Sequence, residues 1–175
     1  WLADPAEEPE PFGDGGTKMA WNTFNVVSIY PNGNPVMSDV NQRWVGDCCA
    51  CAVIASMAYL YPRFVKHIIK DNMDKTYTVT MYDPKGKQIS VGVGGDYFIG
   101  NSGDLGALGG RNKEVTWATI LEKAMIKWNQ IYQGSSNVGG IGTEYVSAIF
   151  TGDGESVGFG ANALIAEDLQ RAVEV

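Results

Sequence analysis

Apolar residues form one long continuous run in the first half of the chain. From Cys48 to Leu60 they occupy nearly every position, and Pro62 ends the run. This pattern predicts a helix that starts at Cys48, has Asp47 as its N-cap and is buried on nearly every face. Pro62 then opens a second, short helix that runs to about Lys70.

A second apolar region has helical spacing instead of continuity. Its large and small apolar residues recur at intervals of three and four, at Trp117, Ile120, Leu121, Ala124, Met125 and Trp128. This spacing predicts a helix after Lys113, and Gly134 is expected to end it. A short segment of unassigned type follows at 145–150, and a last amphipathic helix is predicted at 161–175.

Strict alternation between these regions predicts a β-hairpin. From Thr76 to Val93 threonines alternate with Tyr, Val and Met, and the sequence DPKG supplies the turn. Residues 21–30 favour an extended segment or strand, whereas the glycine-rich stretches 94–110 and 135–142 are expected to be loops. Helices with a local hairpin, and no repeated strand–helix–strand unit, are typical of an α+β fold.

Length and charge limit the possible partners. The chain has 175 residues and a formal net charge of −7, enough for one globular domain. No cluster of Lys and Arg is present to bind phosphate backbones or anionic lipid, so neither nucleic acid nor a membrane is an expected partner. No apolar stretch is long enough for a bilayer span.

Residues 1–20, rich in Pro, Glu and Gly, are expected to form a flexible or extended arm before the domain at 21–175. Because the chain opens with Trp1 and not Met, we expect that a preceding segment was removed.

The three cysteines crowd together at the start of the first predicted helix. Neighbouring cysteines on a helix rarely reach disulfide geometry, and the spacing of Cys48, Cys49 and Cys51 does not suit zinc. Cys48 differs from the other two because it lies in the first helical turn, where free N–H groups and the helix dipole stabilise a thiolate. Gln42, six residues upstream, could bind a tetrahedral oxyanion together with the Cys48 N–H. For Cys49 and Cys51 a packing role is the simpler interpretation.

Three blocks of the sequence resemble the calpain family of papain-like cysteine peptidases, and specifically a bacterial-type member. They are the residues NQRWVGDCCACAVIASM at 41–57, WATILEKAMIKWNQIY at 117–132 and FTG at 150–152. The resemblance implies the nucleophile half of the catalytic core, with Cys48 as nucleophile and Gln42 in the oxyanion hole. It further implies a cysteine endopeptidase acting on protein or peptide substrates.

Two departures from the family pattern affect this interpretation. Cys49 stands where the family usually has Trp. In addition, the family takes its catalytic His and Asn from a second half that follows the Phe-Thr-Gly block, whereas the single histidine here, His67, lies on the helix after Cys48. We therefore expect a companion chain, or the autocatalytically cleaved continuation of the precursor, to supply His and Asn.

The resemblance also implies calcium and substrate contacts. Asp39, after the loop YPNGNP at 30–35, and Glu114, before Trp117, match the positions of calcium ligands in the nucleophile half, and such oxygen ligands suit Ca²⁺. Alternatively, Asp39 caps a turn and Glu114 favours a helix N-terminus. Gly139 and Gly140 match a glycine pair along which a substrate backbone passes, although a plain loop would look the same.

Two other functional classes fit parts of the pattern. A pseudo-peptidase or binding module would keep the fold without activating a thiol, and the Gln42 and Gly-Asp-Cys pattern argues against it. A transglutaminase-like acyl transferase would use a similar cysteine helix, but the Leu-Glu-Lys-Ala and Phe-Thr-Gly blocks favour the peptidase.

Overall fold

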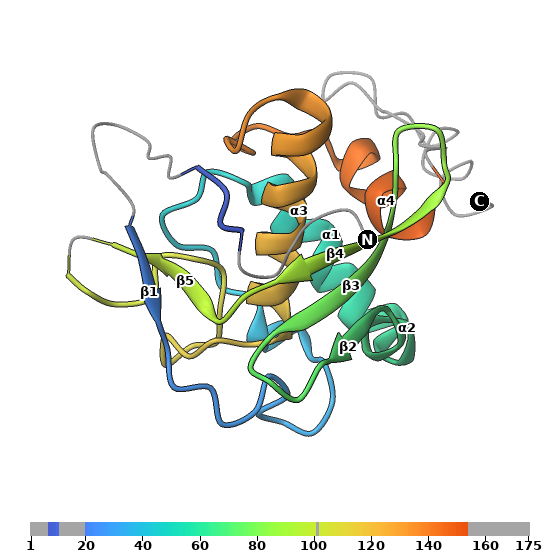
Figure 1. The fold of residues 1–175 in the computed structure, drawn as a ribbon. Coiled ribbons are helices and arrows are strands. Elements are labelled where there is room, and N and C mark those ends of the chain that lie inside the picture. Colours follow the sequence, from blue (N-terminus) through green and yellow to red (C-terminus); the bar gives the residue numbers. More distant parts are fainter. Residues whose placement is uncertain (1–6, 11–19, 101, 154–175) are drawn as a thin grey trace, which may run out of the picture.

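The computed structural model describes residues 7–10, 20–100 and 102–153 (Figure 1). Within these residues the chain forms a mixed α+β fold, which confirms the predicted class. Its helices are α1 (Cys48–Leu60), α2 (Pro62–Ile68), α3 (Trp117–Gln133), α4 (Thr143–Thr151) and the short 3₁₀ helix η1 (Met37–Asp39). Its strands are β1 (Ala20–Thr23), β2 (Ile69–Asp71), β3 (Tyr77–Tyr82), β4 (Gln88–Val93) and β5 (Asp96–Ile99).

The predicted hairpin is confirmed and forms most of a three-stranded antiparallel sheet in the order β2-β3-β4. The pairing of β3 with β4 runs from Tyr77 opposite Val93 to Tyr82 opposite Gln88. Along β3 Tyr, Val and Met are buried while the residues between them are half-exposed, as the alternation predicts. One face of this sheet therefore turns to the core.

A second sheet pairs β1 with β5, and it corrects two predictions. The extended segment expected over 21–30 is a strand only to Thr23, and the glycine-rich stretch 94–110, expected to be a loop, contains β5. Flanking glycines hid this short strand. It is stabilised by distant partners, since Trp21 stacks on Phe98 with ring centroids 3.8 Å apart.

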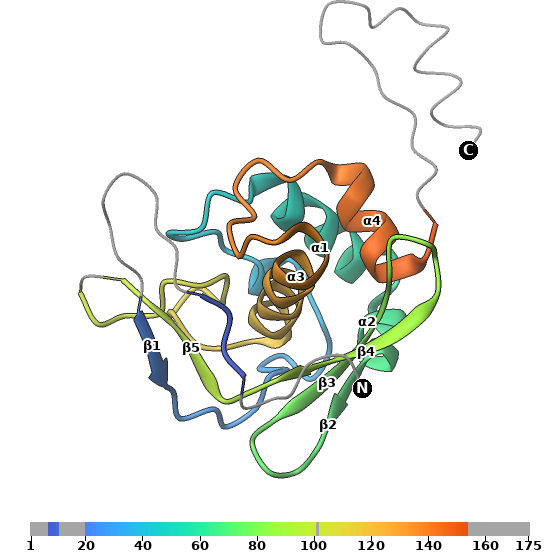
Figure 2. The same cartoon turned by 45° about the horizontal axis from the view of Figure 1, so that its top comes forward.

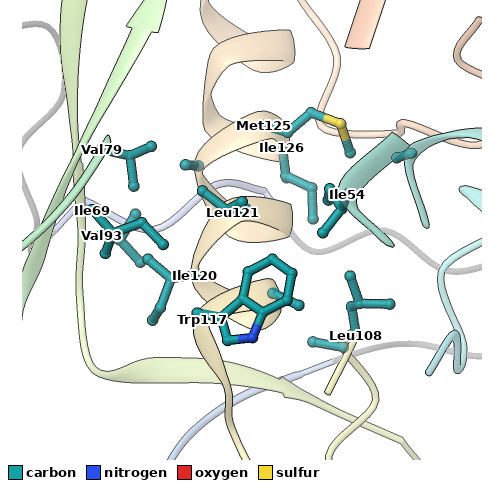
Figure 3. Close-up of a cluster of buried hydrophobic side chains, with 14 of the residues drawn as sticks. Ile54, Ile69, Val79, Val93, Leu108, Trp117, Ile120, Leu121, Met125 and Ile126 are labelled. Carbon is teal, nitrogen blue, oxygen red and sulfur yellow. The ribbon is translucent and has the colours of Figure 1, made fainter. Parts of the chain in front are cut away.

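Helix α3 lies at the centre of the molecule, between the β2-β3-β4 sheet and α1 (Figures 1 and 2). Figure 3 shows Val79 and Val93 on one side of α3 and Ile54 on the other. Every residue from Trp117 to Asn129 is buried, including the charged ones. Gly134 ends the helix as predicted, with a left-handed φ of 72° that suits glycine. An element enclosed in this way must find partners for all its polar groups.

Helix α1 begins at Cys48 as predicted, but it is not buried on every face. Ala50, Ile54, Met57 and Ala58 are buried, whereas Cys48 is exposed and Tyr59 retains 73% of its surface. A helix that is apolar all round does not show which side is covered. Among the described residues, nothing covers the side of α1 that carries Cys48 and Tyr59.

Two further segments were predicted from the sequence. The expected helix at 161–175 lies outside the described residues. In the N-terminal segment Glu8 forms a 2.5 Å ion pair with Lys123 on α3, and Pro9 accepts a hydrogen bond from the Trp21 indole at 3.0 Å.

Among the described helices none is by itself long and apolar enough to cross a membrane. The pair α1 and α2 has the composition for it but is bent by 112°.

Asp39 joins the start of the chain to the central helix. Its carboxylate accepts hydrogen bonds from the indole of Trp117 at 2.7 Å, the amide of Asn32 at 2.9 Å and the N–H of Val36 at 3.3 Å. Asp39 is 2% exposed, and Trp117 is fully buried. The carboxylate thus fixes η1 and its preceding loop against the first turn of α3.

We expect Asp39→Ala to lower the free energy of unfolding by about 1–3 kcal/mol, because the buried Trp117 N–H loses its acceptor. Urea denaturation measures this change. Asp39→Asn is the matched control, since it keeps one acceptor oxygen and should lose less. Wild-type stability in Asp39→Ala would show that the carboxylate does not hold these segments together.

Candidate active site

The loop from Gln42 to Asp47 leads directly into α1. Backbone hydrogen bonds hold it against the glycine-rich loop, from Asn41 N to Gly109 O at 3.0 Å and from Trp44 N to Gly106 O at 3.0 Å. Val45 is buried at its centre. The Gln42 amide donates to the Val45 carbonyl at 2.9 Å, so this side chain folds back over the loop.

Cys48 is the first residue of α1 and its side chain is exposed. The first N–H groups of a helix have no intrahelical acceptor, and the N-terminal end of the helix dipole favours negative charge. The Cys48 thiol is also open to an incoming reagent. Cys49 and Cys51 are both only half-buried, and the structure contains all three cysteines as free thiols.

Asp47 occupies the N-cap position of α1, but its side chain does not cap the helix as predicted. It turns into the core, where it is completely buried and accepts a hydrogen bond from the Cys51 thiol at 3.5 Å. The reason for this inward turn lies on α3, where Glu122 faces it. The prediction of Asp47 as a capping side chain is therefore wrong, although α1 starts where expected.

Asp47 and Glu122 form a buried pair of carboxyl groups behind the N-terminus of α1. Burial raises the pKa of Asp47 to about 6, while hydrogen bonds from Cys51, Glu122 and Gln42 act in the opposite direction. Burial and the charge of Asp47 raise the pKa of Glu122 well above its ordinary value. Glu122 also accepts a hydrogen bond from Leu108 N at 2.9 Å. Burial and the neighbouring charge thus favour a protonated Glu122 beside an ionised Asp47.

The predicted glycine pair lies beside the same loop. Gly140 N donates to the Gly46 carbonyl at 3.2 Å, and a Cβ on Gly139 would lie 3.8 Å from the same oxygen. A cavity of about 410 Å³ opens next to the pair and is lined also by Trp128 and Tyr145. The structure thus places the glycine pair beside the loop that joins Gln42 to Cys48, although about 90 residues separate them in the sequence.

The two predicted calcium ligands, Asp39 and Glu114, differ in whether their carboxylate oxygens already have hydrogen-bond partners. Both carboxylate oxygens of Asp39 already accept hydrogen bonds, which agrees with the turn-capping alternative. Glu114 packs over Gly110, where a Cβ would lie 2.1 Å from Oε1, and its Oε2 is buried without a hydrogen-bond partner. The described residues contain no group of three or more His, Cys, Asp and Glu side chains suited to a metal ion. Of the two, only Glu114 has an oxygen that lacks a partner.

His67 lies far from the thiol. It is exposed near the end of α2, which follows the C-terminal end of α1, whereas Cys48 is at the opposite end of α1. Thirteen helical residues span about 20 Å at 1.5 Å per residue. An imidazole at this distance cannot take a proton from Cys48, so His67 has a surface role, as the sequence suggests.

Comparison with known protein families identifies the domain. A model described as calpain family cysteine protease matches residues 21–166, which is most of the chain. The chain belongs to the calpain family of cysteine proteases. A search of curated proteins found no match. The calpain-family match takes in Gln42, Cys48, Glu122 and the glycine pair, and it confirms the family resemblance of the three sequence blocks.

The buried carboxyl pair of this calpain-family domain predicts a pH-dependent stability. Folded Glu122 keeps its proton above its ordinary pKa of 4.5, whereas unfolded Glu122 loses it there. The folded state then binds more protons, so the free energy of unfolding falls as pH rises above this value. Glu122→Gln keeps a donor for Asp47 and an acceptor for Leu108 N without titrating.

From pH 5 to pH 7 the wild type should therefore lose about 1–3 kcal/mol relative to Glu122→Gln, since one pKa unit corresponds to about 1.4 kcal/mol. Urea denaturation of both proteins across this range measures the difference. Comparing the two proteins cancels the contribution of acidic groups outside the Asp47–Glu122 pair. Parallel pH profiles would contradict a protonated Glu122.

Proposed function

We propose that this chain supplies the nucleophile half of a cysteine endopeptidase. The observation that carries the proposal is the exposed Cys48 at the N-terminus of α1, next to Gln42 on the loop that enters the helix. In this reaction the Cys48 thiolate attacks a peptide carbonyl carbon, and the developing oxyanion is bound by the Cys48 N–H and the Gln42 amide. Gln42 must then exchange one of its present acceptors for the oxyanion.

The substrate approaches along the glycine pair. Gly139 and Gly140 carry no side chain that would keep an extended backbone away, and they adjoin the cavity next to the Cys48 loop. Tyr145, which is 60% exposed, and Trp44, which is 47% exposed, provide apolar surface on this side of the molecule. The calpain-family match supports peptide-bond hydrolysis over transglutaminase-type acyl transfer.

Expulsion of the amine needs an acid, and no imidazole of this chain lies near the thiol. The one histidine is His67, at the far end of α1. We therefore propose that a companion chain, or the cleaved continuation of the precursor, supplies His and Asn. The uncovered side of α1 supports this proposal, because it leaves Cys48 accessible to a second half.

We predict that the 175-residue chain alone reacts at Cys48 but does not hydrolyse protein. Iodoacetamide or an epoxide should label Cys48 before Cys49 and Cys51, while casein is cleaved only at background rate. Once the second half is added, activity should appear, and Gln42→Ala should lower kcat by about 10²–10³ through loss of an oxyanion donor.

His67→Ala is the control, because an exposed histidine on α2 should affect neither labelling nor assembled activity. Casein hydrolysis by the isolated chain, retained in His67→Ala, would refute the two-half model. Equal labelling of the three cysteines would favour the pseudo-peptidase instead.

Calcium regulation is general in the calpain family, and we propose that Ca²⁺ binds at Glu114. Its buried Oε2 has no hydrogen-bond partner, and a cation would satisfy it. The carbonyls of the loop at 30–35 are the other candidate ligands. Asp39 would join them only by releasing the Asn32 amide from Oδ1.

Calcium should then raise the melting temperature of the wild type relative to chelator, while magnesium does so less. At a calcium concentration of 100 Kd the stabilisation is about 2.7 kcal/mol by mass action. Glu114→Gln should remove the calcium-dependent shift and retain the fold. Equal melting temperatures in calcium and chelator would eliminate this site.

A further inference from the structure

The three cysteines at the start of α1 contain the spacing C-x-x-C, in Cys48 and Cys51. Cys48 is exposed in the first turn, and Cys51 lies one turn further, half-buried. Residues three apart share one face of a helix, with Cβ atoms about 5–6 Å apart, and a disulfide needs about 3.5–4.5 Å. A small shift of the first turn closes this gap. A bridge between the neighbours Cys48 and Cys49 would instead pull their backbone out of the helical conformation.

A carboxylate that can act as a base, that of Asp47, lies next to the Cys51 thiol. This thiol donates to Oδ1 of Asp47 at 3.5 Å, and Asp47 is completely buried. The other oxygen of Asp47 is buried and has no hydrogen-bond partner among the described residues. Burial and the nearby charge of Asp47 raise the pKa of Cys51, so this thiol remains protonated until Asp47 takes its proton. Gln42 is the remaining polar side chain that acts on Asp47.

The two thiols therefore differ in the way that a reversible redox pair requires. Cys48 is exposed in the first turn of α1, so it is the thiol that an oxidant meets first. Cys51 is shielded, protonated and next to a carboxylate, so it attacks only after Cys48 has been oxidised. Burial and the neighbouring Cys48 and Glu144 raise the pKa of Cys49, but no hydrogen bond joins its thiol to a carboxylate in the described structure.

We propose that Cys48 and Cys51 form a reversible disulfide that blocks the nucleophile, with Asp47 as the base for Cys51. In the first step a peroxide transfers an oxygen atom to the Cys48 thiolate, the O–O bond breaks and the remaining hydroxide is protonated to water. In the second step the Cys51 sulfur attacks the sulfenic sulfur of Cys48 while its proton passes to Asp47. The S–S bond forms, the S–O bond breaks, and the departing hydroxide becomes water with that proton.

Two electrons thus pass from the two thiols to the peroxide, and a dithiol reverses the reaction. The disulfide itself does not depend on the proposed peptidase activity. Only its consequence, reversible inhibition of hydrolysis, rests on the proposed function. The bridge would also protect Cys48 from oxidation to the irreversible sulfinic acid.

The test treats the whole 175-residue chain with hydrogen peroxide and follows intact mass, peptide maps and iodoacetamide labelling. The wild type should lose two hydrogen atoms in mass, give a Cys48–Cys51 cross-linked peptide and stop labelling at Cys48. Dithiothreitol should restore the labelling. These readouts need no companion chain, so they distinguish failure of the disulfide from failure of the peptidase proposal.

Cys51→Ala should gain two oxygen atoms at Cys48 instead, and dithiothreitol should not reverse the gain. Cys49→Ala is the matched control, with one thiol removed from the same turn, and it should behave as the wild type. Asp47→Asn should slow disulfide formation about tenfold or more without changing the rate of the first oxidation. A Cys48–Cys49 cross-link, or reversible oxidation that persists in Cys51→Ala, would overturn the proposal.

Discussion

The enclosure of α3 from Trp117 to Asn129 determines how the rest of the molecule is assembled. A helix buried on every side gains a large apolar contact area, but its charged residues lose water on every side as well. Each of them must then find a partner in another segment. Glu122 interacts with Asp47. Lys123 forms an ion pair with Glu8 and donates hydrogen bonds to the carbonyls of Gly94 and Asp96. The position of those segments follows from this requirement.

The polar contacts of α3 also position the functional loop. The indole of Trp117 holds Asp39 before Gln42, and Glu122 holds both Leu108 N and Asp47. The loop that carries Gln42 is thus anchored at both ends to one helix. Lys123 acts similarly on the other side, since its ammonium lies 4.6 Å from the Trp21 ring centroid and so secures β1. Substitutions inside α3 will therefore alter the active site without touching it.

The sequence predicted those features that depend on local patterns. Period 3.6 located α3, alternation located the β3-β4 hairpin, and Pro62 and Gly134 located helix boundaries. The predictions that were wrong depended on distant contacts. Strand β5 is stabilised by its pairing with β1, in which Trp21 stacks on Phe98. The side chain of Asp47 turns inward, toward Glu122 on α3. The burial of Glu122 is not predicted, because a Glu within a Leu-Glu-Lys-Ala helix has the pattern of a solvent-exposed residue.

One signal in the sequence could have indicated the buried carboxyl pair. The residues four positions before and after Glu122 are Ala118 and Ile126, and both are apolar and buried. Residues four apart share one face of a helix, so the sequence places Glu122 on an apolar face. No such signal exists for the exposed side of α1, because its sequence is apolar all round and exposure depends on what the fold places beside it.

The carboxyl pair also limits the negative charge next to Cys48, the proposed nucleophile. A second negative charge directly before Cys48 would oppose the thiolate that the helix N-terminus favours. Because Glu122 retains its proton, the two carboxyl groups together contribute one negative charge and not two. That remaining charge lies on Asp47, turned away from Cys48 and toward Cys51. The same arrangement thus limits the negative charge near Cys48 and contributes, together with burial, to the raised pKa of Cys51. It does so through a residue on α3 that contacts neither thiol in the described hydrogen-bond network.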